Sequence, residues 1–521
     1  MSGPSTDNQI NSVLIVGGGT AGWLAACHLA KKLRPGDPDG IRVTLVESPD
    51  IPTIGVGEGT VPAMRQSLQY LGISETDFIR ECEATFKQSI RFDGWMRNPE
   101  HSYHHVFDYP RRDSLDLTPY WLLNRQNKSY ADSVGIQSSL CDAGLGPKQM
   151  TEPEYSGISN YAYHLDAGKF SELLTRHATT QLGVEHRQAN ISAVQLNASG
   201  DIDYLETDRL GELRADFYVD CTGFKSLLLG SAMGVEFVDR SDVLLADHAL
   251  AVQVPYASPD SPIPCQTIAT ARSAGWIWDI GLVSRRGTGY VYSSQHIDHD
   301  KAELELRDYL RTSIGDAADE VSCRRIPMQV GYRERFWSRN CAAIGLSQGF
   351  VEPLEATGLL MFDATARMLA EQFPASRDVM PLLSERFNKR VRFTWERVID
   401  FIKLHYCVSD RDDSSFWQAN RDPATIPESL QENLQLWRHQ PPSEYDFPSK
   451  LEIFNLENYL YVLYGMDYPT DIAPLAYRYP HQQIATSAVE SSAALAEQAK
   501  QLLLPHRELI QKIHRYGLQK I

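Results

Sequence analysis

The first fifty residues alternate between short apolar runs and polar turns. The β-branched run SVLIV over Ser12–Val16 predicts a buried strand, and it leads through the turn GGGTAG into WLAACHLAKKL, whose apolar residues recur at helical spacing. A polar turn, GDPDG, then precedes a second predicted strand, Arg42–Val46, which ends at Glu47. This succession of strand, glycine turn, helix and strand predicts a βαβ unit.

Farther along the chain the pattern changes from mixed strands to helices. Residues 96–160 are rich in Tyr, His and Pro and predict loops, whereas alternating patterns between residues 161 and 293 predict strands of a mixed sheet. From Leu359 onward helical periodicity dominates, and a long helix is expected over Gln483–Leu504, where Pro505 interrupts it. We therefore expect an α/β fold: a Rossmann-like βαβ module, an inserted mixed β-sheet region and a mainly helical C-terminal region.

Composition excludes several classes of function. The 521 residues are 42% hydrophobic and 22% charged, which is typical of a globular enzyme. The net charge of −17, without a concentrated basic face, disfavours nucleic-acid binding. No run approaches the roughly 20 apolar residues that span a membrane, so we expect a cytoplasmic protein. The eight cysteines are scattered without a C-x-x-C pair, which predicts free thiols and no metal site.

The glycine turn has the G-x-G-x-x-G form of a dinucleotide site. Its first glycine permits a tight turn, its second lets main-chain N–H groups approach a pyrophosphate, and its third allows close helix packing. These positions are Gly17, Gly19 and Gly22, and we expect Thr20 and Ala21 in the same turn to contact the cofactor as well. A carboxylate at the end of the second strand, here Glu47, is placed to accept hydrogen bonds from ribose hydroxyls.

Two later glycine segments favour FAD over NAD. DFYVDCTGFKS (216–226) and CAAIGLSQGFVEPLEATG (341–358) each predict a strand followed by a glycine turn, as flavoproteins use late in the chain, and small residues there allow close approach to a flat ring. We therefore expect FAD, with Gly57, Leu346 and Leu359 among its contacts. The FAD-binding module would comprise residues 1–100, 155–245 and 325–370. The substrate-side sheet and loops would comprise residues 101–154 and 246–324, and the helical C-terminal region would comprise residues 371–521.

Four segments together resemble the flavin-dependent halogenases of the tryptophan halogenase family. They are GGGTAGWLAA, then GVGEGTVP followed by ATFKQSIRFDGW, then GWIWDIGL, and finally GFVEPLEATGL. Their order and spacing match the family, and the resemblance spans nearly the whole chain.

The resemblance implies a reaction and residues to perform it. In the family, reduced FAD and O2 oxidise chloride or bromide to hypohalous acid, which passes through a tunnel to a lysine in a T-F-K context, here Lys87. The resemblance implies that Lys87 either donates a hydrogen bond to the hypohalous acid or forms a chloramine with it. The family's glutamate, in an E-P-L-E-x-T-G context, maps onto Glu355, which would polarise the oxidant or accept the ring proton. Glu352 is the competing carboxylate, but the motif register favours Glu355. Halide would bind at the main-chain N–H groups of Thr357 and Gly358.

The GWIWDIGL segment fits the family's W-x-W-x-I-P pattern, except that Gly281 occupies the proline position. Alternation places Trp276 and Trp278 on one face of a strand, and the resemblance implies that they wall off the flavin from the substrate. Two aromatic residues at this spacing are also typical of an ordinary core.

Three functions fit these observations. The first is a halogenase that receives reduced FAD from a separate NAD(P)H-dependent flavin reductase, because the chain has no second dinucleotide fingerprint. The second is a single-component FAD-dependent aromatic monooxygenase, and the third is a flavin-binding protein without catalysis. Lys87 and Glu355 favour the halogenase, and we expect an indole or another small electron-rich arene as substrate. The tyrosines of residues 455–465 and the histidine-rich loop 101–109 are candidates for its chamber, although helical spacing also fits the tyrosines to core packing.

Overall fold

The opening βαβ unit forms as the sequence predicts, because its apolar runs are buried in a parallel sheet. The computed structural model describes residues 8–51, 57–110, 115–125 and 128–520. All five residues of β1 (Ser12–Val16) are buried, and β1 pairs in parallel with β2 (Arg42–Glu47) and β12 (Phe217–Asp220). This six-stranded sheet has the order β20-β21-β12-β1-β2-β8, and its other members are β8 (Glu185–Gln188), β20 (Trp337–Ser338) and β21 (Cys341–Ala343).

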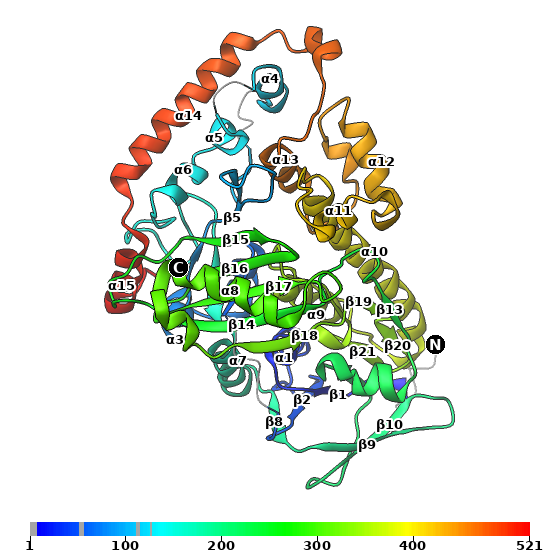
Figure 1. The fold of residues 1–521 in the computed structure, drawn as a ribbon. Coiled ribbons are helices and arrows are strands. Elements are labelled where there is room, and N and C mark those ends of the chain that lie inside the picture. The colour runs from blue at the N-terminus through cyan, green and yellow to red at the C-terminus, as the bar shows by residue number, and fades with distance from the viewer. Residues whose placement is uncertain (1–7, 52–56, 111–114, 126–127, 521) are drawn as a thin grey trace.

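Three helices pack together beside this sheet (Figure 1). They are α1 (Thr20–Leu33), which connects β1 to β2, α7 (Ala167–Gln181) and α9 (Thr357–Glu371), and α1 contacts both of the others. Ten residues of α1 are buried, which explains its Ala-rich and nearly uncharged first turns. The N-terminus of α1 follows the glycine turn directly, so the fold places that turn at the carboxyl end of β1.

A second large sheet carries the mixed region of the fold. Its seven strands have the order β18-β14-β17-β16-β15-β5-β6, and its pairs are antiparallel apart from β15 with β5. The strands are β5 (Ser89–Asp93), β6 (Ser102–Val106), β14 (His248–Pro255), β15 (Gln266–Arg272), β16 (Gly275–Gly281), β17 (Arg285–Tyr292) and β18 (Arg324–Pro327), with α8 (His299–Ile314) packed against β17. Residues 89–93 thus pair within this sheet, although the sequence-based division places them in the first module; that division stays a prediction.

Three-stranded sheets complete the β-structure. One contains β3 (Gly57–Gly59), β7 (Ala162–Asp166) and β4 (Thr85–Lys87), in the order β3-β7-β4. Only Gln88 separates β4 from β5, so this small sheet adjoins the seven-stranded one. The others consist of β9 (Ile191–Leu196), β10 (Ile202–Thr207) and β11 (Glu212–Leu213), and of β13 (Phe237–Asp239), β19 (Gly331–Arg333) and β22 (Gly349–Phe350).

The expectation that residues 96–160 form only loops is wrong. The described part of this segment contains β6 and the short helices α4 (Thr118–Leu123), α5 (Tyr130–Val134) and α6 (Gln137–Asp142). Two aromatic residues of these helices pack against the C-terminal region: the rings of Trp121 and Tyr130 both contact Tyr464. Tertiary packing therefore stabilises helices that are too short to be recognised from periodicity.

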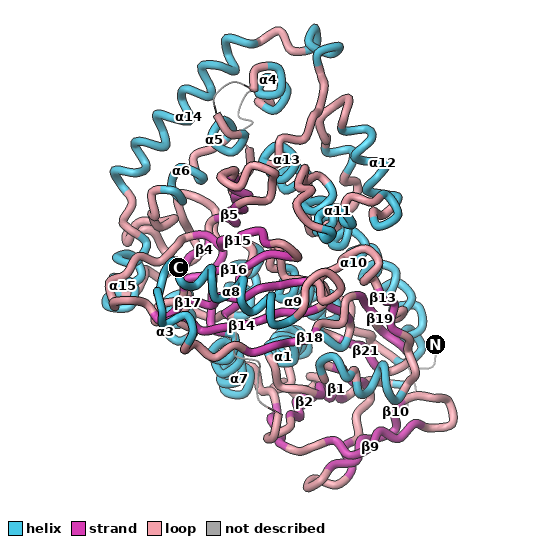
Figure 2. Tube along the Cα trace, in the orientation of Figure 1, coloured by secondary structure: helices cyan, strands magenta, loops and turns pink. Residues whose placement is uncertain are grey.

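The C-terminal region is mainly helical, as predicted (Figure 2). It contains α10 (Met380–Cys407), α11 (Ser415–Asn420), α12 (Glu428–Trp437), α13 (Leu456–Gly465), α14 (Gln482–Leu502) and α15 (His506–Tyr516), whereas α2 (Ala63–Leu71) and α3 (Glu75–Glu81) lie near the start of the chain. The predicted long helix ends at Leu502, and Pro505 forms the N-cap of α15. Among the described residues, no helix combines the length and the apolar character that crossing a membrane requires.

Candidate active site

The glycine turn has the tight geometry that the fingerprint predicts. Gly17 has φ of +113°, and a Cβ atom there would lie 2.2 Å from the oxygen of Cys221. A Cβ atom on Gly22 would lie 1.9 Å from the oxygen of Gly17, whereas one on Gly19 would meet nothing within 4 Å. The first and third glycines are therefore required by packing, and the second faces open space where a ligand's phosphate can approach.

One cavity extends from the glycine turn to Lys87 and the two tryptophans of β16. It has a volume of about 670 Å³, which lies within the range of cofactor sites. It is lined by Gly17, Gly19, Thr20, Ala21, Glu47, Gly57, Leu346, Gly358 and Leu359, and also by Lys87, Trp276 and Trp278. Gly22, Glu355 and Thr357 are not among the lining residues, and Gly55 and Val56 of the GVGEGTVP motif lie outside the described residues.

The composition of this cavity fits FAD. Its glycine turn offers main-chain N–H groups and a helix N-terminus for a pyrophosphate, and Glu47 lies at the end of β2 beside the turn. Leu346, Phe350, Leu359 and Phe362 supply apolar surface for a flat ring. The sequence did not predict His186, whose Nε2 lies 2.7 Å from Oε1 of Glu47 and orients that carboxylate.

Lys87 is a buried cavity residue and not a surface lysine. It ends β4, its side chain is 1% exposed, and Nζ donates a hydrogen bond of 3.1 Å to the main-chain oxygen of Thr60. The ring of Phe107 lies 5.4 Å from Nζ. Burial lowers the pKa of Lys87 to about 8, although the negative charge of Glu355 opposes this shift.

Two histidines hold Glu355. His105 lies in the histidine-rich segment 101–109 that the sequence indicates as a candidate chamber wall, whereas no motif indicates His405. Oε1 of Glu355 lies 2.9 Å from Nδ1 of His105 and 2.8 Å from Nε2 of His405. Burial alone would raise the pKa of Glu355, but the charge of His105 and the hydrogen bonds from both histidines outweigh it and lower this pKa to about 2. His105 lies in β6, Glu355 in the loop before α9, and His405 in α10. Because these elements are far apart in the sequence, no local motif predicts their contact.

Glu352 has a different environment from Glu355. Its Oε2 accepts hydrogen bonds of 2.6 Å from the indole nitrogen of Trp276 and of 2.6 Å from the hydroxyl of Tyr406, while Oε1 is buried without a partner. Burial raises the pKa of Glu352 to about 7. The carboxylate that interacts electrostatically with Lys87 is Glu355. This agrees with the motif register, which favours Glu355 over Glu352.

The N-terminus of α9 presents main-chain donors beside the cavity. Ala356 adopts a left-handed conformation with φ of +56°, and the helix begins at Thr357. The first N–H groups of a helix lack partners within the helix, so they are available to an anion. Gly358 lines the cavity, whereas Thr357 is 1% exposed, and its hydroxyl contacts the main-chain oxygen of Glu352 at 3.4 Å.

The two tryptophans of β16 both face the cavity, as alternation along a strand predicts. A Cβ atom on Gly289 of β17 would lie 2.1 Å from the ring of Trp278, so a glycine at this position makes room for the ring. Tyr461 and Tyr464 in α13 are buried instead among aromatic neighbours such as Tyr130, and neither lines this cavity.

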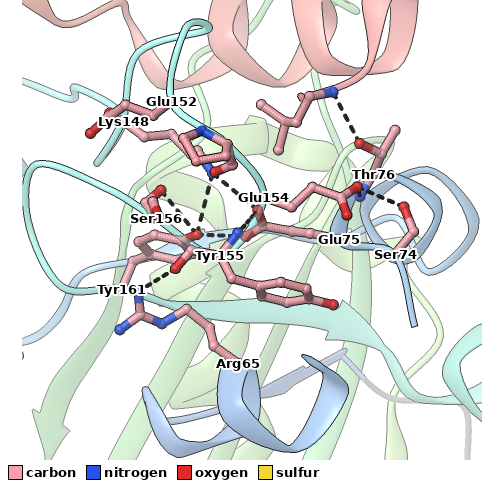
Figure 3. Close-up of polar contacts among 12 residues, drawn as sticks. Arg65, Ser74, Glu75, Thr76, Lys148, Glu152, Glu154, Tyr155, Ser156 and Tyr161 are labelled. Carbon is pink, nitrogen blue, oxygen red and sulfur yellow. Dashed lines mark hydrogen bonds and ion pairs between the residues drawn. The ribbon is translucent and has the colours of Figure 1, made fainter. Parts of the chain in front are cut away.

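A buried polar network supports the sheet that carries Lys87 (Figure 3). Nζ of Lys148 lies 3.0 Å from Oε2 of Glu75, and both side chains are fully buried. Oε1 of Glu75 accepts hydrogen bonds of 2.6 Å from Tyr161 and of 2.7 Å from Tyr163, a residue of β7. Because β7 pairs with β4, this network anchors the strand next to Lys87.

Comparisons with known proteins agree with these features. The tryptophan halogenase family model matches residues 12–481. The chain is 37% identical to tryptophan 6-halogenase SttH of Streptomyces toxytricini, with 84% of this chain and 86% of that protein covered, and 34% identical to tryptophan 7-halogenase RebH of Lentzea aerocolonigenes, with 98% and 99% covered. A crystal structure of a tryptophan halogenase from Shewanella frigidimarina superposes with a TM-score of 0.94 at 43% identity, covering 98% of this chain and 99% of that one.

These findings confirm the family resemblance and the fold class inferred from the sequence, because the matches extend across nearly the whole chain. The chain belongs to the tryptophan halogenase family and is a flavin-dependent halogenase.

Proposed function

We propose that this enzyme uses reduced FAD, O2 and chloride or bromide to halogenate an indole or a similar electron-rich arene through Lys87. The observation that carries the proposal is the shared cavity: the glycine turn and the buried amine of Lys87 line the same 670 Å³ space. An oxidant formed beside a flavin can reach Lys87 without entering bulk water.

The chain's own groups would hold the reactants in this cavity. Gly17, Gly19, Thr20 and Ala21 would bind the pyrophosphate, Glu47 the ribose, and the main-chain N–H groups of Thr357 and Gly358 the halide. When bound and reduced, FAD supplies together with O2 the two-electron oxidation of halide to hypohalous acid.

Lys87 would act on this oxidant as a hydrogen-bond donor. With a pKa of about 8, its amine is mostly protonated at pH 7, yet it loses its proton more easily than an exposed lysine. Donation from Nζ to the oxygen of hypohalous acid polarises the bond between oxygen and halogen, so the halogen becomes a better electrophile. The oxygen leaves as water, and burial keeps other water away from the reactive halogen.

Glu355 would accept the proton that the ring loses after halogen addition. A carboxylate whose pKa is about 2 remains ionised at neutral pH, and its negative charge stabilises the cationic ring intermediate. SttH and RebH are tryptophan halogenases, which supports an indole as the substrate. The aromatic groups of His105 and Phe107, which contact Glu355 and Lys87, support a flat substrate at this place.

A separate NAD(P)H-dependent flavin reductase would supply the reduced FAD. Mixing NADPH with the oxidised holoenzyme alone is then expected to leave the flavin yellow, whereas a single-component monooxygenase would bleach it. The direct test is a panel of indoles, phenols and pyrroles incubated with reductase and each halide, with isotope patterns read by mass spectrometry. Halogenated indole is the expected product, and hydroxylated products without halogen would overturn the proposal.

A further inference from the structure

We propose that His405 is a positioning residue that stands as an imidazolium against Glu355 in the resting enzyme, so that one proton is shared within a buried His405–Glu355 dyad. The inference rests on the proposed function, because it assigns to this dyad the handling of the proton that the substrate ring releases.

The hydrogen bonds of His405 fix its protons. Nδ1 lies 2.8 Å from the main-chain oxygen of Phe401, and a carbonyl oxygen only accepts, so Nδ1 carries a hydrogen. Nε2 lies 2.8 Å from Oε1 of Glu355, and a hydrogen bond there requires a second proton on one of the two atoms. A neutral imidazole facing a free carboxylate would leave this contact without a proton.

His105 supplies a second donor to the same oxygen. Its Nδ1 lies 2.9 Å from Oε1 of Glu355, and its Nε2 lies 3.0 Å from Oδ1 of Asn458, whose Nδ2 donates to the main-chain oxygen of Asn455 at 3.4 Å. Both ring nitrogens of His105 thus also face oxygen atoms, but an amide can be turned to present its NH2 group, whereas the main-chain oxygen of Phe401 can only accept. The contacts of His405 therefore require two protons whichever way the Asn458 amide lies. The hydrogen bonds described for Glu355 thus converge on Oε1, which leaves Oε2 to receive a proton from the substrate.

The surroundings favour an ion pair over an isolated carboxylate. Both His405 and Glu355 are buried, and the rings of Phe92, Trp95 and Phe401 flank His405 without contributing charge. The titratable groups that face Glu355 are His105, His405, Lys87 and the neutral phenol of Tyr103, whose pKa is raised by burial and by Glu355 itself. The low pKa of Glu355, about 2, agrees with a cationic neighbour.

The dyad also balances the protons of the reaction. Lys87 gives one proton to the oxidant, whose oxygen leaves as water when the bond between oxygen and halogen breaks. The C–H bond at the halogenated carbon then breaks, its electron pair returns to the ring, and its proton moves to Oε2 of Glu355. Glu355 is now neutral beside an imidazolium, a state that favours passing the proton on and so restoring Lys87.

Two substitutions at position 405 separate the charge of the imidazole from its hydrogen bonds. In His405→Asn, the amide reaches the Nδ1 position and keeps the bond to Phe401, but the contact with Glu355 is lost. In His405→Gln, the longer amide reaches the Nε2 position and still donates to Glu355, without a proton that titrates. His104→Gln is the matched control, because His104 lies beside His105 on β6 but contacts Ser89 and Asp142 instead.

The closing experiment pairs 15N NMR of histidine-labelled enzyme with the pH profile of single-turnover halogenation. We expect the signal that disappears in His405→Gln to show both ring nitrogens protonated at pH 7.5, and to change to a neutral ring in Glu355→Gln. We expect His405→Asn to halogenate at least roughly tenfold more slowly, with the acidic limb of its profile displaced to higher pH, while His405→Gln retains more activity and His104→Gln matches the wild type.

A neutral His405 in the wild-type spectrum would overturn the dyad, as would a wild-type pH profile in His405→Asn. The two readouts separate the two proposals, because the NMR measurement needs no turnover. Wild-type enzyme that halogenates no arene would overturn the proposed function, while the spectra would still decide the protonation of His405.

Discussion

Gly22 packs so closely against Gly17 that a Cβ atom on Gly22 would lie 1.9 Å from the main-chain oxygen of Gly17. This contact brings the first turn of α1 against the glycine turn that follows β1. Gly19, two residues after Gly17, has the opposite property, since its missing side chain faces open space in the cavity. Gly22 is therefore required for packing of the turn, whereas Gly19 leaves room for the ligand.

The pair Gly22→Ala and Gly19→Ala should separate these roles. Gly22→Ala forces the turn apart, so we expect a lower melting temperature together with lost FAD binding. Gly19→Ala has room for its methyl group and an ordinary backbone conformation, so its melting temperature should match the wild type. Because the methyl group enters the cavity, its FAD affinity should fall on the order of tenfold, about 1.4 kcal/mol. Thermal unfolding and FAD fluorescence titration measure both, and an unaltered Gly22→Ala variant would contradict this account.

Glu352 should make stability depend on pH. Its pKa is raised from 4.5 to about 7 in the folded protein. The contribution of Glu352 to the free energy of unfolding is therefore complete below pH 4.5 and is lost as the pH rises through about 7. The shift corresponds to roughly 3 kcal/mol. Glu352→Gln keeps an acceptor for Trp276 and Tyr406 but cannot ionise, so its advantage in melting temperature over the wild type should be larger at pH 8.5 than at pH 5.5. An advantage that stays constant between these pH values would refute the assignment.

Lys148 should matter for stability and not for chemistry. Lys148→Met leaves the charge of Glu75 buried and unpaired, which typically destabilises a protein by roughly 3–5 kcal/mol. The double variant Glu75→Gln with Lys148→Met removes that charge and should recover part of the loss. Melting temperatures of the two variants test this expectation, and a single variant as stable as the wild type would show that the pair contributes little.

The sequence predicts the parts of this fold that depend on local patterns. The SVLIV strand, the glycine turn and α1 are encoded within adjacent residues. Alternation predicts that Trp276 and Trp278 lie on one face of a strand, and both side chains line the cavity. The short helices of residues 118–142 escaped prediction because packing against α13 and α14, and not their own periodicity, stabilises them.

The surroundings of the candidate catalytic residues could not be derived in the same way. Glu355 meets His105 from a strand 250 positions earlier and His405 from a helix 50 positions later. Within α10, His405 belongs to a run of buried residues and has no distinguishing neighbour pattern. Such contacts arise only from the tertiary fold, so the motif located Glu355 but not the groups that set its charge.

Glu355→Gln should slow halogenation without disturbing the cavity. The amide can still form hydrogen bonds with His105 and His405, because its NH2 group can donate to a neutral His405 ring, but it cannot take a proton from the substrate ring. Because general base catalysis typically contributes 10²- to 10⁴-fold, we expect a loss of about this size in the rate of product formation. FAD affinity and the rate of flavin oxidation serve as internal controls. Unchanged turnover would assign Glu355 a purely structural role.

Lys87→Ala tests the central claim most directly. The measurement is the amount of halogenated indole formed per reduced FAD oxidised, with the hypohalous acid that escapes trapped by a small thiol in the same reaction. We predict that the wild type gives halogenated indole, and that Lys87→Ala gives none while it binds and oxidises FAD at wild-type levels and releases more trapped oxidant than the wild type. Wild-type yields of halogenated indole from Lys87→Ala would contradict the account.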